Sequence, residues 1–228
     1  MKRKILWVLT ALPLVATCAV LPFLPEQIPA HYDLAGEVDR WGSKFESLIF
    51  PAVIVLLGFV WFLVLRSAGK KCAAAADDKA RAAAVRNEKV FLWAALGTTV
   101  ILCALQIVSL ITAARGASSS TDSLRSLTIF FLGLLLVLFG LLMPKTKRNG
   151  AFGLRTHWSM KNDRAWKKSN RLGGIVMVIC GLLVVLLSAV LPGALAGLAA
   201  LGVLLLDVIV SVICSFIAGK NEPEEPEK

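Results

Sequence analysis

Six long apolar runs, separated by polar segments, set the pattern of the chain. Each run has 17 or more residues, and Asp207 is the only formally charged residue within them. A helix needs about 20 apolar residues to cross a membrane, because the hydrocarbon core is about 30 Å thick and each residue rises about 1.5 Å. The pattern predicts transmembrane helices over residues 5–23, 48–65, 90–113, 127–143, 175–191 and 194–218.

The composition agrees with this pattern. Of the 228 residues, 57% are hydrophobic, and the mean hydropathy is +0.74, whereas soluble globular domains have about 45–50% apolar residues. We therefore predict an all-α membrane protein. The basic start, residues 1–4, is typical of a signal peptide, but no A-x-A pattern closes the first run and five further spans follow, so we expect an uncleaved first helix.

Lys and Arg alternate in number from one polar segment to the next. Segments 1–4, 66–89 and 144–171 carry 3, 7 and 9 of them, whereas segments 24–47 and 114–126 carry 2 each. Because positive residues collect on the cytoplasmic side of a membrane, this alternation predicts that both termini lie in the cytoplasm. The same asymmetry accounts for the net charge of +10, so we expect no direct binding of nucleic acid.

The predicted extracytoplasmic loop, residues 24–47, is rich in prolines and turn residues. Prolines end the helix and favour extended backbone before them, so we expect short extended pieces joined by turns. Acidic residues outnumber basic ones five to two in this loop. The candidate ligand-binding residues are His31, Asp33, Asp39 and Trp41. The two histidines of the chain fall on opposite sides of the membrane in this topology, so we predict no metal site.

The predicted cytoplasmic loop over residues 144–174 mixes basic, aromatic and amide side chains in a set order. After Thr156 the apolar residues fall near one helical face, which predicts a cytoplasmic interfacial helix with Trp158 and Trp166 at the level of the lipid headgroups. We expect this loop either to anchor on lipid or to dock a cytoplasmic partner. The candidate residues are Asn149, Arg155, Trp158, Lys161, Asn162, Asp163, Trp166 and Arg171.

The expected organisation has four parts. They are an N-terminal membrane module (5–66) that contains the external loop 24–47, a central helical loop and third span (67–126), a C-terminal membrane module (127–218) and a disordered tail (219–228). The tail ends in NEPEEPEK, whose alternating Pro and Glu can neither continue a helix nor bury a core. Small residues spaced along the spans, Gly133 with Gly140 and Gly193 with Gly197, indicate contacts between helices.

Asp207 is the fourteenth residue of a 25-residue apolar run and is expected near mid-bilayer. An ionised, unpaired carboxylate there costs about 2.5–3.5 kcal/mol. Two interpretations stay open. Asp207 is a proton or cation site or a ligand anchor, or it is protonated or hydrogen-bonded to a Ser, a Thr or Gln106 of another helix.

The sequence carries no motif of a known catalytic or nucleotide-binding site. G-x-S-x-G, H-E-x-x-H, Walker and G-x-G-x-x-G patterns are absent, and His157 lies among Lys and Arg residues. The five cysteines show no C-x-x-C spacing, and none falls in a predicted external loop, so we expect no disulfides. We predict that the protein is not an enzyme and binds no cofactor.

Two polar segments together carry a resemblance to a known family. The external one reads LPEQIPAHYDLAGEVDRWGSK from Leu24, and the internal one reads NGAFGLRTHWSMKNDRAWKKSNRLGG from Asn149. They resemble the N-terminal module and the C-terminal signature of the SdpI family of integral membrane proteins, and the second segment is the more specific. With the six spans, the resemblance covers most of the chain.

The resemblance implies a non-enzymatic protein of the bacterial plasma membrane that protects the cell from a secreted, membrane-active toxic peptide. The named member of the family also acts as a signalling receptor, which holds a cytoplasmic repressor at the membrane when toxin is bound. The expected partners are therefore membrane lipids, a toxic peptide outside and a repressor inside, with the oligomeric state left open. Two alternatives remain: a small proton-coupled transporter or exporter that uses Asp207, and a structural protein whose loops only anchor it.

Overall fold

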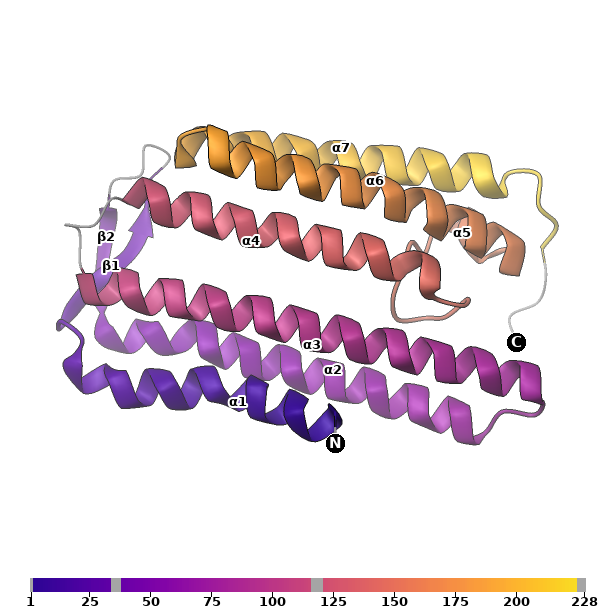
Figure 1. Cartoon of the computed structure of the whole chain (residues 1–228), viewed down its shortest axis with the longest axis horizontal. Helices are drawn as coiled ribbons and strands as arrows, with labels where there is room; N and C mark the ends of the chain where they lie inside the picture. The colour runs from indigo at the N-terminus through magenta and orange to yellow at the C-terminus, as the bar shows by residue number, and fades with distance from the viewer. Residues whose placement is uncertain (1, 34–37, 116–120, 225–228) are drawn as a thin grey trace. The chain divides into compact units, whose positions relative to one another are not determined.

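The computed structural model describes residues 2–33, 38–115 and 121–224 (Figure 1). Within these residues, six helices are long and apolar enough to cross a membrane, which confirms the six predicted spans. They are α1 (Lys2–Val20), α2 (Ile49–Ala73), α3 (Asp78–Arg115), α4 (Thr121–Leu142), α6 (Asp163–Val190) and α7 (Gly193–Gly219). The predicted second external loop lies partly at residues 116–120, outside the described residues.

The side chains of these helices are distributed as in a membrane protein. On α1, Val8 and Val15 are exposed, whereas Thr10 and Thr17 are fully buried. Each threonine donates its hydroxyl hydrogen bond to the carbonyl four residues earlier in the same helix, so the polar groups are satisfied inside while the large apolar groups face outward. This arrangement is stable in lipid, where apolar surface needs no burial.

The chain divides into two compact units, and each long helix after α1 contributes to both. The first unit comprises Met1–Val60, Ala95–Leu132 and Val184–Ala200. In it, Gln106 Nε2 of α3 donates a 2.9 Å hydrogen bond to Thr17 Oγ1 of α1. A Cβ placed on Gly58 of α2 would lie 2.2 Å from the Thr10 methyl, so α2 approaches α1 closely at this glycine.

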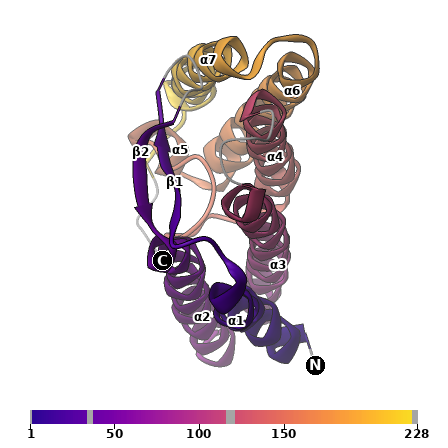
Figure 2. The ribbon, with the colours of Figure 1, turned by 90° about the vertical axis from the view of Figure 1, so that its left-hand side faces the viewer.

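A small hairpin belongs to the same unit. Strand β1 (Gln27–Tyr32) pairs antiparallel with β2 (Val38–Ser43), and the two lie side by side in Figure 2. The pairing becomes irregular after Pro29, which has no backbone N–H to donate. Leu24 and Ile28 are buried against Ala113 near the end of α3, so apolar contacts attach the start of the hairpin to the helices.

The second unit comprises Trp61–Ala94, Gly133–Leu183 and Leu201–Lys228. Its helices α4 and α6 meet backbone to backbone at glycines. A Cβ on Gly140 would lie 2.7 Å from the Gly174 carbonyl oxygen, and a Cβ on Gly181 would lie 2.8 Å from the Gly133 carbonyl oxygen. The predicted contact roles of Gly133 and Gly140 are therefore confirmed.

The loop predicted to be helical between the second and third spans consists largely of extensions of α2 and α3. These helices are separated by a short turn, and Asp77 Oδ1 accepts a 2.6 Å hydrogen bond from Ala80 N at the start of α3. A carboxylate at this position satisfies a free N–H of the first turn and interacts favourably with the helix dipole.

The stretch after Thr156 is helical, as predicted: α5 (His157–Met160) is a single turn, and α6 begins at Asp163 and continues into the fifth span. One prediction about the second unit is corrected. The tail is not disordered throughout, because Glu222 contacts Lys168 and Pro223 contacts Asn162, as detailed below. Residues 225–228 lie outside the described residues.

Candidate functional site

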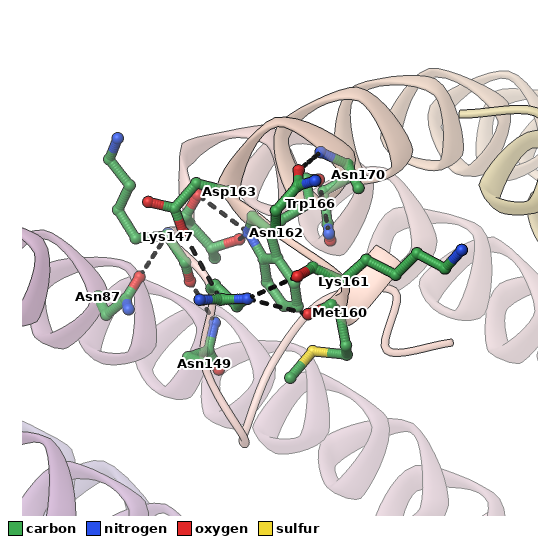
Figure 3. Close-up of polar contacts among 12 residues, drawn as sticks. Asn87, Lys147, Asn149, Met160, Lys161, Asn162, Asp163, Trp166 and Asn170 are labelled. Atoms are coloured by element: carbon green, nitrogen blue, oxygen red, sulfur yellow. Dashed lines mark hydrogen bonds and ion pairs between the residues drawn. The ribbon is translucent and has the colours of Figure 1, made fainter. Parts of the chain in front are cut away.

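The polar loop at residues 145–170, which we call the signature loop, is tied at its start to α3. Arg86 Nε donates to Lys145 O at 2.7 Å, and Lys147 N donates to Asn87 Oδ1 at 2.7 Å. Figure 3 shows Asn87 and Lys147 joined in this way. Asn87 is buried, so its side chain fixes the loop instead of meeting solvent.

Asn149 closes the first turn of the signature loop with both ends of its amide. Its Oδ1 accepts from the backbone N–H groups of Ala151 and Phe152 at 2.8 Å, and its Nδ2 donates to the Lys147 and Phe152 carbonyls. The Phe152 ring packs edge-on against Phe139. The turn is therefore both hydrogen-bonded and anchored on the helices.

The next turn is held by a buried pair from α6, Trp166 and Asn170. Trp166 is only 1% exposed, and its Nε1 donates to Thr146. Asn170 Oδ1 accepts from Leu154 N at 2.8 Å, and its Nδ2 donates to the Trp166 and Leu154 carbonyls. Gly153 sits over this pair with a φ of +116°, where a Cβ would lie 2.4 Å from Asn170 Oδ1.

Helix α5 starts at a complete capping box. Thr156 Oγ1 accepts from Ser159 N, and Ser159 Oγ accepts from Thr156 N, so two free donors of the first turn are satisfied. Thr156 is also hydrogen-bonded to Ser215 of α7. Trp158 packs edge-on against Phe216 of α7, with ring centroids 5.2 Å apart.

Arg148 and Asn162 join α5 to α6. The Arg148 guanidinium donates to the carbonyls of Met160 and Lys161 at 3.0 and 3.1 Å and lies 3.6 Å from the Asp163 carboxylate. Figure 3 labels Met160, Lys161 and Asp163. Asn162 Oδ1 accepts from Ala165 N at 2.8 Å, the usual N-cap bond of a helix start.

The opposite face of α5 and α6 is basic and exposed. Its side chains project from the loop residues described above, whose polar groups are already hydrogen-bonded within the protein. We call these residues, from Thr146 to Asn170, the frame. The exposed basic side chains are His157, Arg164, Lys167, Lys168 and Arg171, with Arg155 exposed just before α5. Such a surface can bind carboxylates or phosphates by charge and hydrogen bonding. Among the described residues, no group of three His, Cys, Asp or Glu side chains could hold a metal ion.

The structure divides the eight candidate residues of this loop into two sets. Asn162 and Trp166 are buried, and Asn149 uses its amide within the turn, so these three build the frame. The expectation that Trp158 and Trp166 lie at the lipid headgroups is wrong for Trp166, because its ring is enclosed by the loop. Arg155, Asp163 and Arg171 are exposed, whereas Trp158 and Lys161 are half-buried.

Of the hairpin candidates, the structure brings two together. His31 Nδ1 of β1 lies 2.7 Å from Asp39 Oδ1 of β2, and both side chains are exposed. Asp33 contributes its backbone carbonyl, which accepts a hydrogen bond from Arg125 of α4. Trp41 is 46% exposed and pairs across the hairpin with Pro29. The hairpin thus presents an exposed aromatic ring and an exposed, hydrogen-bonded His–Asp pair.

Asp207 is buried on α7, and it is the first of three buried polar residues of this helix at four-residue spacing, Asp207, Ser211 and Ser215, which we call the polar file. Within the described part of the chain, Asp207 Oδ1 and Ser211 Oγ have no hydrogen-bond partner. Ser215, one turn further on, donates to Ser169 Oγ at 3.4 Å and is hydrogen-bonded to Thr156 of the signature loop. Gln106, one of the partners considered for Asp207, donates to Thr17.

Several site residues were not predicted from the sequence. They are Asn87, Thr146, Arg148, Ser159, Asn170 and Glu222. A signal for Asn170 was present, because Asn162, Trp166 and Asn170 recur every four residues and therefore lie on one helical face. The partners of the others are distant in sequence, and no local pattern points to them.

The chain was compared with protein families, curated proteins and solved structures, and the family match includes the signature loop. Residues 145–216 match the model of the SdpI/YfhL protein family, and residues 8–55 match a domain of unknown function, DUF1648. The chain is 23% identical over 217 residues to Immunity protein SdpI of Bacillus subtilis (strain 168), with 95% of each chain covered. No solved structure matches the chain.

The six apolar helices and this similarity place the chain in the bacterial plasma membrane as a multi-pass protein. The matched family segment begins at Lys145 and contains the whole frame from Thr146 to Asn170 together with most of α7. The predicted resemblance is confirmed: residues 145–216 match the SdpI/YfhL family model, and the chain is similar to Immunity protein SdpI along 95% of its length.

Proposed function

We propose that this chain is a membrane immunity protein, which protects its cell from a secreted, membrane-active toxic peptide. The observation that carries the proposal is the similarity to Immunity protein SdpI along 95% of both chains, which extends over the hairpin, the signature loop and the spans alike. The function requires no catalysis: binding the peptide, or keeping it from assembling in the bilayer, is sufficient.

The proposed orientation places the hairpin outside and the signature loop in the cytoplasm. It rests on the excess of Lys and Arg in the segments around α5 and between α2 and α3. In this orientation a peptide arriving from outside meets the hairpin first. The signature loop then faces the cytoplasm, where it can hold a repressor at the membrane and report that toxin is bound.

The hairpin offers the proposed contact surface for the peptide. Two ion pairs, Lys44 with Glu26 at 2.8 Å and Arg40 with Glu46 at 2.9 Å, neutralise charges within the hairpin region. Trp41 and Phe45 remain exposed at 46% and 60%. Exposed aromatic side chains beside charged groups suit an amphipathic peptide, because each ring provides a large contact area at little cost in conformational entropy.

A survival assay tests the proposal. A host killed by a secreted membrane-active peptide is given the wild-type chain, the Trp41→Ala variant or an empty vector, with membrane abundance checked for each. We expect wild type to protect and Trp41→Ala to protect less, because the exposed ring contributes to binding rather than to packing. Val53→Ala, at an exposed apolar position of α2, is the matched control and should protect like wild type. Equal killing of wild type and vector would refute the proposal for that peptide.

The polar file on α7 favours a second candidate, a small proton-coupled transporter. Asp207 and Ser211 leave polar atoms unsatisfied inside the membrane, within the described residues, and intramembrane acids of this kind commonly mark proton or ion pathways. Under this candidate, Asp207→Asn abolishes flux that depends on the proton gradient. If the Asp207→Asn variant protects against the peptide as well as wild type does, the immunity proposal stands. Protection would then not depend on protonation and deprotonation of Asp207.

A further inference from the structure

The segment after α7 turns back onto the signature loop. Glu222 N donates to Gly219 O at 3.2 Å, which closes a turn directly after the helix. Gly219 permits this path, because a Cβ there would lie 2.3 Å from the Trp158 carbonyl oxygen of α5. The end of α7 therefore packs against α5, and the residues that follow reach the basic face of α5 and α6.

Three successive residues of this segment each contact a different side chain of the loop. Glu222 Oε1 lies 2.8 Å from Lys168 Nζ and 3.6 Å from Arg164 Nε. The Pro223 carbonyl accepts a 2.8 Å hydrogen bond from Asn162 Nδ2. Glu224 and His157 are 3.6 Å apart. The contacts follow the order of the chain, as in the binding of an extended peptide.

The carboxylate at position 222 is held most closely. Its side chain is 13% exposed although it lies at the protein surface. The hydrogen bond from Lys168, with the nearby charges of Lys168 and Arg164, lowers the pKa of Glu222 below its ordinary value. Asn162 is suited to its role, because its Oδ1 caps α6 while its Nδ2 remains available for a backbone carbonyl.

We propose that the basic face formed by His157, Asn162, Arg164 and Lys168 is a docking site for an extended acidic segment of a partner protein, and that residues 221–224 occupy it as an intramolecular competitor. The proposal deepens the proposed function, since the partner would be the cytoplasmic protein held at the membrane. Its chemistry follows from the groups present: cations for carboxylates and an amide for a backbone carbonyl, as in other acidic-motif sites.

The contacts are suited to exchange. The Arg164 side chain is 76% exposed and that of Lys168 47% exposed even with the tail in place. Exposed ion pairs are weak and are screened by salt. The tail competes mainly because it is tethered, which gives it an effective concentration in the millimolar range. An acidic segment with more contacts than residues 221–224 can therefore displace it.

The test measures binding of a labelled acetylated peptide, NEPEEPEK, to the full-length chain in phosphatidylcholine nanodiscs by fluorescence anisotropy. Glu222→Gln/Glu224→Gln loosens the chain's own tail without shortening it. We expect this variant to bind the peptide about tenfold more tightly than wild type, because the tethered competitor is weakened. Equal affinity for the two chains would overturn the proposal.

Specificity is tested in the loosened background. Adding Asn162→Asp keeps an acceptor for the α6 cap but removes the donor to the peptide carbonyl, and adding Lys168→Gln removes the main cation; each should reduce peptide binding about tenfold. Lys167→Gln, an exposed neighbour outside the tail contacts of the described chain, is the charge-matched control. Equal loss with Lys167→Gln, or equal binding of a scrambled peptide, would show non-specific attraction and overturn the proposal.

Anionic lipid is the competing occupant of this face. We expect phosphatidylglycerol in the nanodiscs to weaken peptide binding by no more than added salt weakens it. If anionic lipid abolishes it at constant ionic strength, the face binds headgroups and the proposal fails. No toxin enters this assay, so the two proposals can fail separately. A chain that binds the NEPEEPEK peptide but does not protect cells would refute immunity alone. A chain that protects cells but does not bind the NEPEEPEK peptide would refute the docking site alone.

Discussion

At the scale of single residues, Gly153 is the most constrained backbone position of the signature loop. Its φ of +116° lies in a region that residues with a Cβ rarely adopt, and Asn170 Oδ1 occupies the place where a Cβ would go. Asn170 in turn satisfies Leu154 N and the Trp166 carbonyl. One glycine thus permits the hydrogen bonds that close the loop over α6.

Gly153→Ala is therefore predicted to destabilise the protein by about 1–3 kcal/mol, the usual cost of a residue held in a disfavoured backbone region. Thermal unfolding in detergent measures the change. Gly150→Ala is the matched control, because a Cβ there meets nothing within 4 Å, and it should unfold like wild type. A Gly153→Ala protein as stable as the control would show that the loop tolerates another backbone path.

Glu222 predicts a dependence of tail and peptide docking on pH. Its pKa is lowered by the hydrogen bond from Lys168, so docking favours the ionised carboxylate. The contribution is fully present above the ordinary pKa of 4.5 and is lost as the pH falls through the lowered value. With His157→Gln, which removes the titratable imidazole that faces Glu224, peptide affinity in the nanodisc assay should stay constant from neutral pH down to about this range and then fall. Affinity that rises on acidification would contradict the assigned role of the carboxylate.

At the scale of elements, α6 shows what the sequence could and could not predict. The buried side of its first turns, together with its N-cap, carries small, polar and aromatic residues. They are Asn162, Ala165, Trp166, Ser169, Asn170 and Gly173. The helical period was visible in the sequence, but hydrophobicity alone assigned Trp166 to the membrane interface. Its ring N–H instead donates a hydrogen bond to Thr146, and this contact depends on the path of the whole loop.

The long apolar runs, in contrast, were predictable because the bilayer imposes their length and composition independently of tertiary contacts. The hairpin was foreseen only as short extended pieces, and its register was not. The pairing of His31 with Asp39 depends on the irregularity between Pro29 and Tyr32. The docking of residues 221–224 was missed, since an acidic proline-containing segment is typical of disorder unless a matching surface is present.

The glycine contact between α4 and α6 carries a prediction at the same scale. Gly140→Ala would bring a Cβ within 2.7 Å of the Gly174 carbonyl oxygen, and overpacking of this kind costs about 1–3 kcal/mol. Unfolding by SDS titration should show this loss. Gly202→Ala, on α7 with open space around the added carbon, is the control and should change little. Equal stability of the two variants would argue against a close α4–α6 contact.

At the scale of the whole molecule, the orientation in the membrane links the two polar surfaces to two compartments. The prediction is tested in intact cells with a membrane-impermeant maleimide. Glu26→Cys, at a side chain that is 83% exposed, should be labelled from outside in a Cys72→Ala background. The native Cys72, in the basic segment between α2 and α3, should be labelled only after the cells are opened. The reverse pattern would invert the proposed orientation.

The central claim is that the chain keeps a membrane-active peptide from permeabilising the cell. The most direct measurement is the membrane potential, followed with a voltage-sensitive dye while a peptide that depolarises vector-bearing cells is added. Cells containing the wild-type chain are predicted to retain their potential, and cells containing Trp41→Ala are predicted to lose part of it. Wild-type cells that depolarise as fast and as completely as the vector control, at verified membrane abundance, would contradict the account.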